Sequence, residues 1–373
     1  MKNILILNYE FPPLWGGASP VSYEISKGYV NLWYNVDVIT MWYKDLPSFE
    51  IQEWINIHRV KCLRSKKEIC HPWEQMSYLI SGYRKAKQLI AKKTYDVCHC
   101  HFVIPTGALA YKIYKKFQIP YIITAHGSDI PGFNTDRFQL LHKFTPYFLK
   151  KIINNSKYTI SPSIYLQNLI KKNLKWVDTN KLLHIPNGIY PDKFVPGKKE
   201  KIILWTGRLL ERKGFQYLAK AFSEIENVKW YELHICWDGP MMKKLENIKE
   251  NSKNKIVLHG WIDNNGETYK KLQETTSIYC LASEKENASI SLLEAMSGWC
   301  SIITTNVSGC PETVWKDWFL VNPRNSDEIK KHLDFLMNND KIVKEKGDLM
   351  RKRLEEKFDW GNIISEYNNL LVD

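Results

Sequence analysis

Short apolar runs alternate with amphipathic stretches along the whole chain, and this alternation restricts the fold more than any other feature. The first run, at 4–8, is followed by a proline- and glycine-rich loop and then by a helical pattern that begins at Ser19. A second apolar run follows at 36–41. Strand, helix and strand in this order form the βαβ unit of a parallel sheet, so the sequence predicts an α/β protein. Ser19 is expected to be the N-cap of the helix and Pro20 its first residue.

The same pattern continues and then restarts after a linker. Further strands are expected at 96–102, 121–125 and 158–161, and helices at 75–92, 107–116 and 138–154. Residues 185–199 contain three prolines and two glycines, a composition typical of a linker. A second series follows, with strands at 201–205, 230–236, 256–258, 278–281 and 301–304. The sequence therefore predicts two Rossmann-like domains, 1–188 and 198–350, and a C-terminal helical segment, 351–373, that packs back toward the first domain.

Composition narrows the classes of partner and the compartment. The net charge of +13 favours anionic partners such as nucleotides, nucleic acid or acidic lipid headgroups. No run approaches the roughly 18 apolar residues of a spanning helix, and the first run is too short for a signal peptide. The chain is therefore expected in the cytoplasm, with an optional peripheral contact on the inner face of the membrane. Its eight cysteines are expected to be reduced.

The segment Cys98-His99-Cys100-His101 is the one cluster with metal-ligand character. It lies in an expected strand, where alternation directs the two cysteines to one face and the two histidines to the other. Four ligands arranged in this way cannot converge on one ion. We therefore expect no metal site here.

Six short motifs occur in order along the chain. They are Pro-Pro-Leu-Trp-Gly-Gly after the first strand, Asp-Val-Cys-His-Cys-His-Phe, His126-Gly127-Ser128-Asp129, Ile-Pro-Asn-Gly in the linker, Gly207-Arg208 with Lys213-Gly214, and Glu286 eight positions before Glu294. In this order they resemble the retaining glycosyltransferases of the GT-B group known as family 4. The resemblance implies two Rossmann-like domains whose parallel sheets face each other across a cleft. It also implies that the first domain binds the acceptor and the second the nucleotide sugar.

The two glutamates form the most informative pair. Glu286 is expected in a loop after a strand and Glu294 on the helix that follows. A carboxylate accepts hydrogen bonds from two neighbouring hydroxyls, and the resemblance implies that Glu286 holds the donor hexose and Glu294 the ribose. The backbone amides of Ala288, Ser289 and Ile290 are expected to face the diphosphate. The plainer alternative is that both glutamates are solvated surface acids.

Arg208 and Lys213 follow a strand of the second domain, where their cations could bracket the donor phosphates. Stabilising the charge that develops on a leaving diphosphate is a large catalytic effect. The chain also lacks an Asp-X-Asp motif, so neither a metal nor another cofactor is expected. Gly16 and Gly17 are expected to bring backbone close to the donor at a helix start. The alternatives are solvated basic residues and an ordinary turn.

His126 follows an apolar strand and begins a polar loop. The resemblance implies that it contacts the donor sugar near the reacting carbon, without acting as the general base. Asp129 is expected either to orient this loop or the acceptor, or simply to cap the loop, and His101 to be a satisfied histidine beside the strand end. Two departures from the family pattern stand out: Trp237 occupies a position where glycine is usual, and Cys300 one where proline is common.

These observations together predict a retaining, metal-independent hexosyltransferase. Its donor would be a UDP- or GDP-linked sugar, and its acceptor a glycan or lipid-linked glycan in cell-surface polysaccharide, lipopolysaccharide or glycolipid synthesis. Basic stretches at 111–116 and 148–157 either dock on an anionic membrane or are solvated helix faces. The competing interpretations are a nucleotide-sugar epimerase of the same fold and a non-catalytic nucleotide-sugar-binding protein. No RNA-binding motif of the aromatic-sheet type is present, so nucleic acid is not an expected partner.

Overall fold

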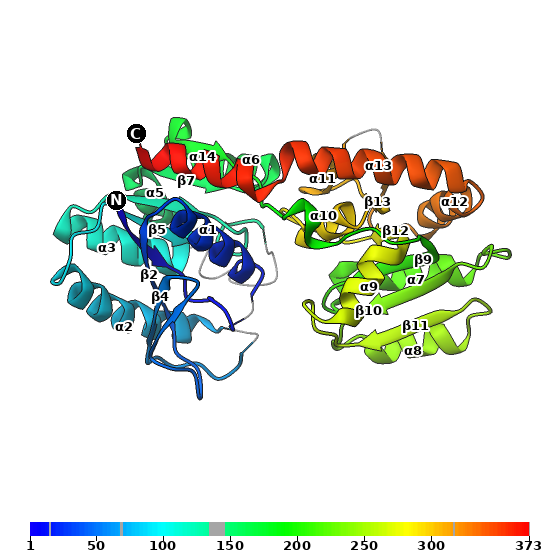
Figure 1. Ribbon diagram of the computed structural model, residues 1–373, viewed down its shortest axis with the longest axis horizontal. Helices are drawn as coiled ribbons and strands as arrows, with labels where there is room; N and C mark the ends of the chain where they lie inside the picture. The colour runs from blue at the N-terminus through cyan, green and yellow to red at the C-terminus, as the bar shows by residue number, and fades with distance from the viewer. Residues whose placement is uncertain (15, 68–69, 134–145, 316–317, 373) are drawn as a thin grey trace. The chain divides into compact units, whose positions relative to one another are not determined.

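The structure, a computed structural model, describes the chain except for residues 15, 68–69, 134–145, 316–317 and 373 (Figure 1). It divides the chain into two compact units. The first contains Met1–Pro186 together with Gly361–Asp373, and the second contains Asn187–Trp360. The first part of the helix expected at 138–154 lies outside the described residues.

The first unit is built on an eight-stranded sheet of order β3-β4-β2-β1-β5-β6-β7-β8. Every neighbouring pair is parallel except β3 and β4, which form an antiparallel hairpin at one edge. The strands are β1 Asn3–Leu7, β2 Asn35–Met41, β3 Phe49–Gln52, β4 Ile55–Val60, β5 Val97–His101, β6 Tyr121–Thr124, β7 Tyr158–Ser161 and β8 Leu182–His184. The helices are α1 Ser19–Asn31, α2 Pro72–Ile90, α3 Ala108–Phe117, α5 Pro146–Asn155, α6 Ile164–Asn173 and α14 Trp360–Val372, with one π-helical turn, η1 Val103–Gly107.

The central strands are buried on both faces, as expected for a parallel sheet covered by helices. Strand β5 shows the consequence for its four-residue cluster. Cys98 and Cys100 pack in the apolar core with Leu5 and Ile123, while the rings of His99 and His101 stack on each other. The expected separation of cysteines from histidines is thus confirmed. All eight cysteines are free thiols.

Helix α14 packs on the first unit although it lies at the far end of the sequence. A Cβ atom added to Gly28 of α1 would overlap the side chain of Ile364, so the glycine lets the two helices approach closely. The Tyr34 hydroxyl donates to Asn368 Oδ1 at 2.7 Å, and the hydroxyls of Thr124 and Tyr367 lie 3.2 Å apart. These contacts tie the C-terminal helix to the sheet of the first unit.

The second unit has a six-stranded parallel sheet of order β11-β10-β9-β12-β13-β14. Its strands are β9 Glu200–Thr206, β10 Glu232–Cys236, β11 Ile256–Gly260, β12 Thr276–Leu281, β13 Ser301–Thr305 and β14 Phe319–Val321. Its α-helices are α7 Phe215–Ser223, α8 Met242–Glu250, α9 Glu267–Thr275, α10 Ile290–Ser297, α11 Cys310–Val314, α12 Ser326–Met337 and α13 Asp340–Lys357. A separate apolar core that includes Trp205, Phe215 and Leu281 holds these layers together.

The α/β class with two parallel-sheet domains is confirmed, while some details of the prediction are wrong. Helix α1 has Ala18 as its N-cap, so Ser19 and Pro20 are its first two residues. The reason is that the backbone N–H of Ser19 already donates to Gly16 O at 3.1 Å. The hairpin β3–β4 and the three-residue strands β8 and β14 were not predicted.

Strand order identifies one topological switch point in each sheet. In the first sheet, β2 lies on one side of β1 and β5 on the other, so the strand order reverses at β1. In the second sheet, β10 and β12 lie on the two sides of β9 in the same way. Open α/β sheets bind ligands beyond the carboxyl ends of the strands at such points. A ligand is therefore expected at the loops after β1, β5, β9 and β12. In the part of the chain that the structure describes, no helix has the length and apolar character needed to cross a membrane.

Candidate active site

The loop after β9 carries the two predicted cations. Gly207 has a φ of 141°, a conformation that favours glycine, and the exposed Arg208 follows it. Lys213 ends a short 3-10 helix, η4 Glu211–Lys213. Gly214 then turns the chain with a φ of 76°, and a Cβ there would overlap the carbonyl oxygen of Ala282. The β9 loop therefore lies directly against the end of β12.

Four hydrogen bonds hold the loop after β12 in place. The backbone N–H of Glu284 donates to Arg212 O at 2.8 Å, and the Ser283 hydroxyl donates to the same oxygen at 3.3 Å. On the other side, the Thr305 hydroxyl donates to Ser283 O at 2.7 Å. The N–H of Gly309 donates to Glu286 O at 3.0 Å. The loop is thus fixed between the β9 loop and the segment that follows β13.

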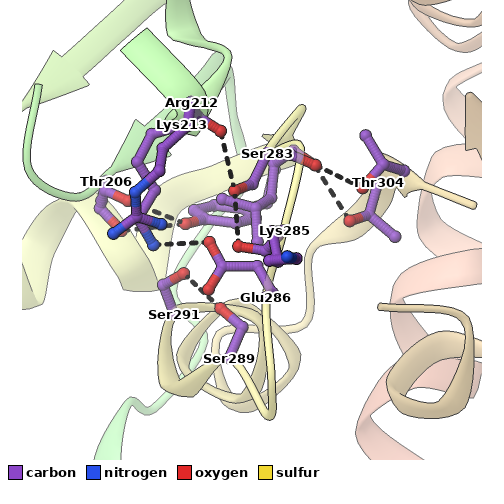
Figure 2. Close-up of polar contacts among 12 residues, drawn as sticks. Thr206, Arg212, Lys213, Ser283, Lys285, Glu286, Ser289, Ser291 and Thr304 are labelled. Carbon is purple, nitrogen blue, oxygen red and sulfur yellow. Dashed lines mark hydrogen bonds and ion pairs between the residues drawn. The ribbon is translucent and has the colours of Figure 1, made fainter. Parts of the chain in front are cut away.

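Lys213 and Glu286 form an ion pair, with 2.6 Å between Nζ and Oε1 (Figure 2). Their side chains are only 20% and 12% exposed, so solvent screens the pair less than it would a surface pair. The predicted phosphate ligand and the predicted sugar ligand of the second unit therefore meet in the structure.

The N-terminus of α10 lies beside this pair. Ser289 is the N-cap, yet its side chain does not cap the helix and instead lies 2.9 Å from the Ser291 hydroxyl. Ala288, Ser289 and Ile290 are half-buried. Asn187, of the Pro-Asn-Gly motif, donates from Nδ2 to Ala288 O at 3.1 Å and so anchors the entry to the helix. A helix start without a side-chain cap is suited to an anion such as a diphosphate.

Glu294 lies on the second turn of α10 and is 5% exposed, so it is not a solvated helix residue. Lys193 Nζ lies 2.6 Å from its Oε1, and the Tyr269 hydroxyl donates to its Oε2 at 2.7 Å. Burial, with the charge of Glu294, raises the pKa of Tyr269, which keeps the phenol protonated as a donor. Sequence reasoning missed Lys193 and Tyr269, because they lie 101 and 25 residues from Glu294 and no local pattern links them.

In the first unit, Gly16 and Gly17 follow β1. A Cβ on Gly16 would overlap the carboxylate of Glu10, whereas Gly17 is exposed with no atom within 4 Å of such a Cβ. Gly16 therefore lies against the carboxylate of Glu10, which would have to move to admit a side chain there, and sequence reasoning did not single out Glu10. Gly17 offers open backbone at the start of α1.

Asp129 organises the loop that carries His126. Its carboxylate accepts from the backbone N–H groups of Val103 at 2.6 Å, Gly127 at 3.0 Å and His126 at 3.3 Å. Burial raises the pKa of Asp129 while these hydrogen bonds act in the opposite direction. Of the roles left open for Asp129, the geometry supports orienting and capping the loop.

Three histidines form a stacked column at the ends of β5 and β6. Ring centroids are 4.7 Å apart for His99 and His101, and 5.3 Å apart for His101 and His126. Burial lowers the pKa of His99 and of His126 to about 3, and it also lowers the pKa of His101 well below its usual value. His126 is therefore neutral near pH 7 and serves as a hydrogen-bonding group. His101 is only partly satisfied: its Nδ1 lies 3.1 Å from His126 Nε2, and its buried Nε2 has no hydrogen-bond partner among the described residues.

Comparison with known proteins decides the family. Residues 15–193 match the family described as Glycosyltransferase Family 4, and residues 189–356 match Glycosyl transferases group 1. The chain belongs to the group 1 glycosyltransferases, family 4, with the GT-B fold. It is therefore a glycosyltransferase.

Three similar proteins illustrate the relationship. An uncharacterized glycosyltransferase of Methanocaldococcus jannaschii is 26% identical, over 98% of this chain and 97% of the relative. The UDP-Gal:alpha-D-GlcNAc-diphosphoundecaprenol alpha-1,3-galactosyltransferase of Escherichia coli is 25% identical, over 80% of each chain. Among solved structures, Anabaena HepE in complex with UDP-glucose has a TM-score of 0.77 at 15% identity, over the full length of both chains.

The residues predicted for the site of this glycosyltransferase lie in both units. In the second unit, Lys213 and Glu286 are in contact beside the start of α10, and Glu294 lies one turn further along that helix. Arg208 is exposed on the adjoining β9 loop. Gly16, Gly17 and His126 belong to loops of the first unit.

Proposed function

We propose that this glycosyltransferase is a retaining, metal-independent hexosyltransferase that uses a UDP- or GDP-linked sugar. The observation that carries the proposal is the meeting of Lys213 and Glu286 at 2.6 Å, beside the uncapped start of α10 and at the switch point of the second sheet. In this proposal Lys213 binds a phosphate and Glu286 binds the hexose hydroxyls. The backbone N–H groups at the start of α10 bind further phosphate oxygens.

The residues have separate roles in the proposed reaction. The bond from the anomeric carbon to the diphosphate oxygen breaks, and Arg208 and Lys213 stabilise the negative charge that develops on the leaving group. The acceptor hydroxyl attacks from the same face, and its proton passes to the departing phosphate oxygen. Glu286 holds the hexose and Glu294 the ribose. His126, neutral near pH 7, offers a hydrogen bond to the sugar.

The donor and acceptor classes rest on relatives and on surface chemistry. HepE was solved with UDP-glucose, and the E. coli relative acts on a diphosphoundecaprenol-linked sugar. In the first unit, α5 exposes Tyr147 and Phe148 at 77% and 42%, and Lys151 lies over the Tyr111 ring of α3. Aromatic and basic residues together suit an anionic membrane surface, so a lipid-linked glycan is the proposed acceptor.

The test is a transfer assay with UDP- and GDP-hexoses in the presence of a metal chelator, with total membrane lipid-linked glycans as acceptor. We expect turnover without added metal and a product whose anomeric configuration, assigned by NMR, equals that of the donor. An inverted product, or activity restored only by a divalent metal, would refute this mechanism.

Two alternatives give different outcomes in the same assay. A nucleotide-sugar epimerase would convert the donor to an isomer without an acceptor. A non-catalytic binding protein would bind the nucleotide sugar in calorimetry and leave it intact with every acceptor. The proposed enzyme instead releases nucleoside diphosphate at a rate that rises with acceptor concentration.

A further inference from the structure

We propose that Lys193 and Tyr269 are positioning residues for Glu294, and that they set its grip on the ribose. This inference rests on the proposed function. Glu294 uses each carboxylate oxygen once within the protein: Oε1 faces Lys193 at 2.6 Å and Oε2 accepts from Tyr269 at 2.7 Å. An ionised carboxylate has about four lone-pair sites, so each oxygen keeps one for a ribose hydroxyl.

Each partner is itself held by neighbouring groups. The segment that carries Lys193 is tied to α10, because the Ser297 hydroxyl donates to Pro191 O at 2.7 Å and Phe194 N donates to that hydroxyl at 3.3 Å. Tyr269, on α9, is 2% exposed, and its hydroxyl accepts from Gln273 Nε2 at 3.0 Å. Three elements of the second unit therefore fix one rotamer of Glu294. A fixed carboxylate loses little freedom when it binds a diol.

The quantity to measure is the preference for a ribonucleotide over its 2′-deoxy form, given by the ratio of the two dissociation constants. Calorimetry would compare UDP, GDP and their 2′-deoxy forms with the unaltered chain and with Lys193→Met, Lys193→Arg and Tyr269→Phe. We expect Lys193→Met and Tyr269→Phe each to weaken ribonucleotide binding by about tenfold, and to reduce the preference over the deoxy form, because a charged hydrogen bond is lost. Lys193→Arg should restore the preference. Lys201→Met, which removes an exposed ion pair with Asp340, is the matched control and should leave binding unchanged.

Two results separate this inference from the proposed function. If the unaltered chain binds no nucleotide, the proposed function fails and this inference fails with it. If the unaltered chain discriminates and Lys193→Met discriminates equally well, or binds ribonucleotide more tightly, only the positioning role is overturned. Tighter binding would mean that Lys193 competes with the ribose.

A second inference comes from the backbone at the tryptophans. The chain has 14 tryptophans, and leaving out Trp15, which is not among the described residues, 13 remain. Seven of these have a positive φ, and they make up half of the 14 non-glycine residues with that conformation. Only a few per cent of non-glycine residues adopt it, and for a bulky side chain it is an outlier. The seven are Trp33 at 63°, Trp54 at 65°, Trp176 at 70°, Trp230 at 70°, Trp237 at 110°, Trp299 at 59° and Trp315 at 92°.

Two of them occupy the glycine position of a Schellman motif. After α1, Trp33 N donates to Val30 O at 2.9 Å and Tyr34 N donates to Tyr29 O at 3.1 Å. After α10, Trp299 N donates to Met296 O at 3.1 Å and Cys300 N donates to Ala295 O at 2.9 Å. These two hydrogen bonds define the Schellman motif. Its C′ residue, here Trp33 or Trp299, has a left-handed backbone conformation and is usually glycine.

Two other tryptophans are the second central residue of a tight turn in which both central residues have a left-handed backbone conformation. Glu53 and Trp54 form the two-residue loop of the β3–β4 hairpin, with φ values of 46° and 65°. Lys229 and Trp230, at 50° and 70°, are spanned by a bond from Tyr231 N to Val228 O of 2.8 Å. These are type I′ turns, whose second central residue is typically glycine.

The remaining positions show the same preference. Trp176 is the third residue of a turn closed by Val177 N to Leu174 O at 3.3 Å, a place where positive φ favours glycine. Trp315 has a φ of 92° and a ψ of 148°, a region that glycine alone normally occupies. Trp237 follows β10 directly, at the carboxyl end of the second sheet.

At four of these positions packing does not explain tryptophan. Trp33, Trp54, Trp176 and Trp230 are 80–91% exposed, so their rings offset little of the backbone strain. The seven lie at the ends of different elements in both units, so what they share is backbone conformation. By contrast, the buried Trp205 and Trp360 are outside the positive-φ set.

The geometry points to glycine, and not tryptophan, as the residue that the cell's own protein carries at these seven positions. The codon UGA is read as tryptophan in some variant genetic codes and as glycine in others, so one reassigned codon accounts for all seven at once. For the glycosyltransferase, the change that matters most is at Trp237. It would remove an indole next to the β9 loop, whose Leu209 N donates to Asp238 O at 3.1 Å.

Mass spectrometry of peptides from the protein isolated from its source cells tests this directly. We expect glycine masses at the seven positions and tryptophan masses at Trp205 and Trp360. As a second arm, a recombinant chain with all seven Trp→Gly changes should melt at a higher temperature than the unaltered chain. The matched control Trp261→Gly, at an exposed residue outside the positive-φ set, should give no such gain. Tryptophan masses at the seven positions, or a lower melting temperature with all seven changes, would overturn the inference.

Discussion

At the scale of single residues, the proposed mechanism depends on the ion pair between Lys213 and Glu286, in which the cation is proposed to bind phosphate and the carboxylate to bind the sugar. Replacing Lys213 with Met removes the cation that would stabilise the leaving diphosphate. We expect kcat/KM to fall by about a hundredfold, as when a preorganised charge donor is lost from an active site. Steady-state kinetics would measure this.

Lys255→Met provides the control, because Lys255 forms an ion pair of similar length, 2.8 Å, with Glu232 but is 66% exposed. Its kcat/KM should stay at the level of the unaltered enzyme. Equal kinetics for Lys213→Met and Lys255→Met would remove Lys213 from the proposed mechanism.

The buried histidine column makes stability depend on pH in a defined direction. Burial is the main reason, and the electrostatic effect of His126 the second, that the pKa of His99 is lowered to about 3, whereas an unfolded histidine titrates near 6.5. Between these values the unfolded chain binds a proton that the folded chain does not. The free energy of unfolding therefore falls as the pH is lowered from about 6.5, by up to about 1.4 kcal/mol per pH unit for each such histidine.

Urea denaturation at pH 7, 6 and 5 would test this for His99. The variant His99→Gln cannot take up the proton, so its free energy of unfolding should fall less steeply than that of the unaltered chain. The slope is compared and not the absolute value, because the substitution also changes hydrogen bonds to Tyr29 and Thr124. Identical slopes would show that His99 does not contribute.

The sequence predicted which elements carry the two glutamates better than it predicted which residues they contact. Glu286 and Glu294 were placed on the correct loop and helix, because strand and helix periodicity are local signals. Their contacts with Lys213 and Lys193 were not predicted, since residues 73 and 101 positions apart meet only through the fold. The same holds for Tyr269.

At the scale of elements, the loops after β9 and β12 fit together through Gly214. A Cβ there would overlap Ala282 O, and its φ of 76° is itself unfavourable for other residues. We expect Gly214→Ala to lower the free energy of unfolding by about 2 kcal/mol and also to weaken donor binding, because the loop that carries Glu286 must shift.

Gly197→Ala is the matched control, since nothing lies within 4 Å of a Cβ at Gly197 and its φ is not in the positive region. Its free energy of unfolding should change by no more than about 0.5 kcal/mol. Chemical denaturation with a parallel nucleotide titration measures both quantities. A tolerated Gly214→Ala with unchanged affinity would mean that the two loops are not coupled.

Elements with a clear period were predicted and those without were missed. The central parallel strands are continuous apolar runs, which the sequence displays directly. The β3–β4 hairpin was missed because its two-residue turn is Glu53-Trp54, which lacks the Asn-Gly type of signal that announces such turns. The first turn of α1 was displaced by one residue, because the cap depends on backbone bonds to Gly16 and not on a side chain.

At the scale of the whole molecule, each unit has an apolar core of its own, so unfolding need not occur in one step. The first unit depends on helix α14 from the end of the chain, through Tyr367 and Ile364. The residues proposed to bind the donor, Lys213, Glu286 and Glu294, all lie in the second unit. Ligand binding and the C-terminal helix should therefore act on different parts of the unfolding curve.

Differential scanning calorimetry, which measures the melting transition of each unit, provides the test. A nucleoside diphosphate at one hundred times its Kd adds about 2.7 kcal/mol to the unit that binds it, so we expect the transition of the second unit alone to rise by about 5 to 10 °C. Tyr367→Ala should instead lower only the transition of the first unit, because it removes a buried side chain there. If the nucleotide raised the first transition and left the second unchanged, the donor would bind away from Lys213, Glu286 and Glu294. The assignment of the second unit as the nucleotide-sugar domain would then be wrong, since binding stabilises the unit whose folded form holds the ligand.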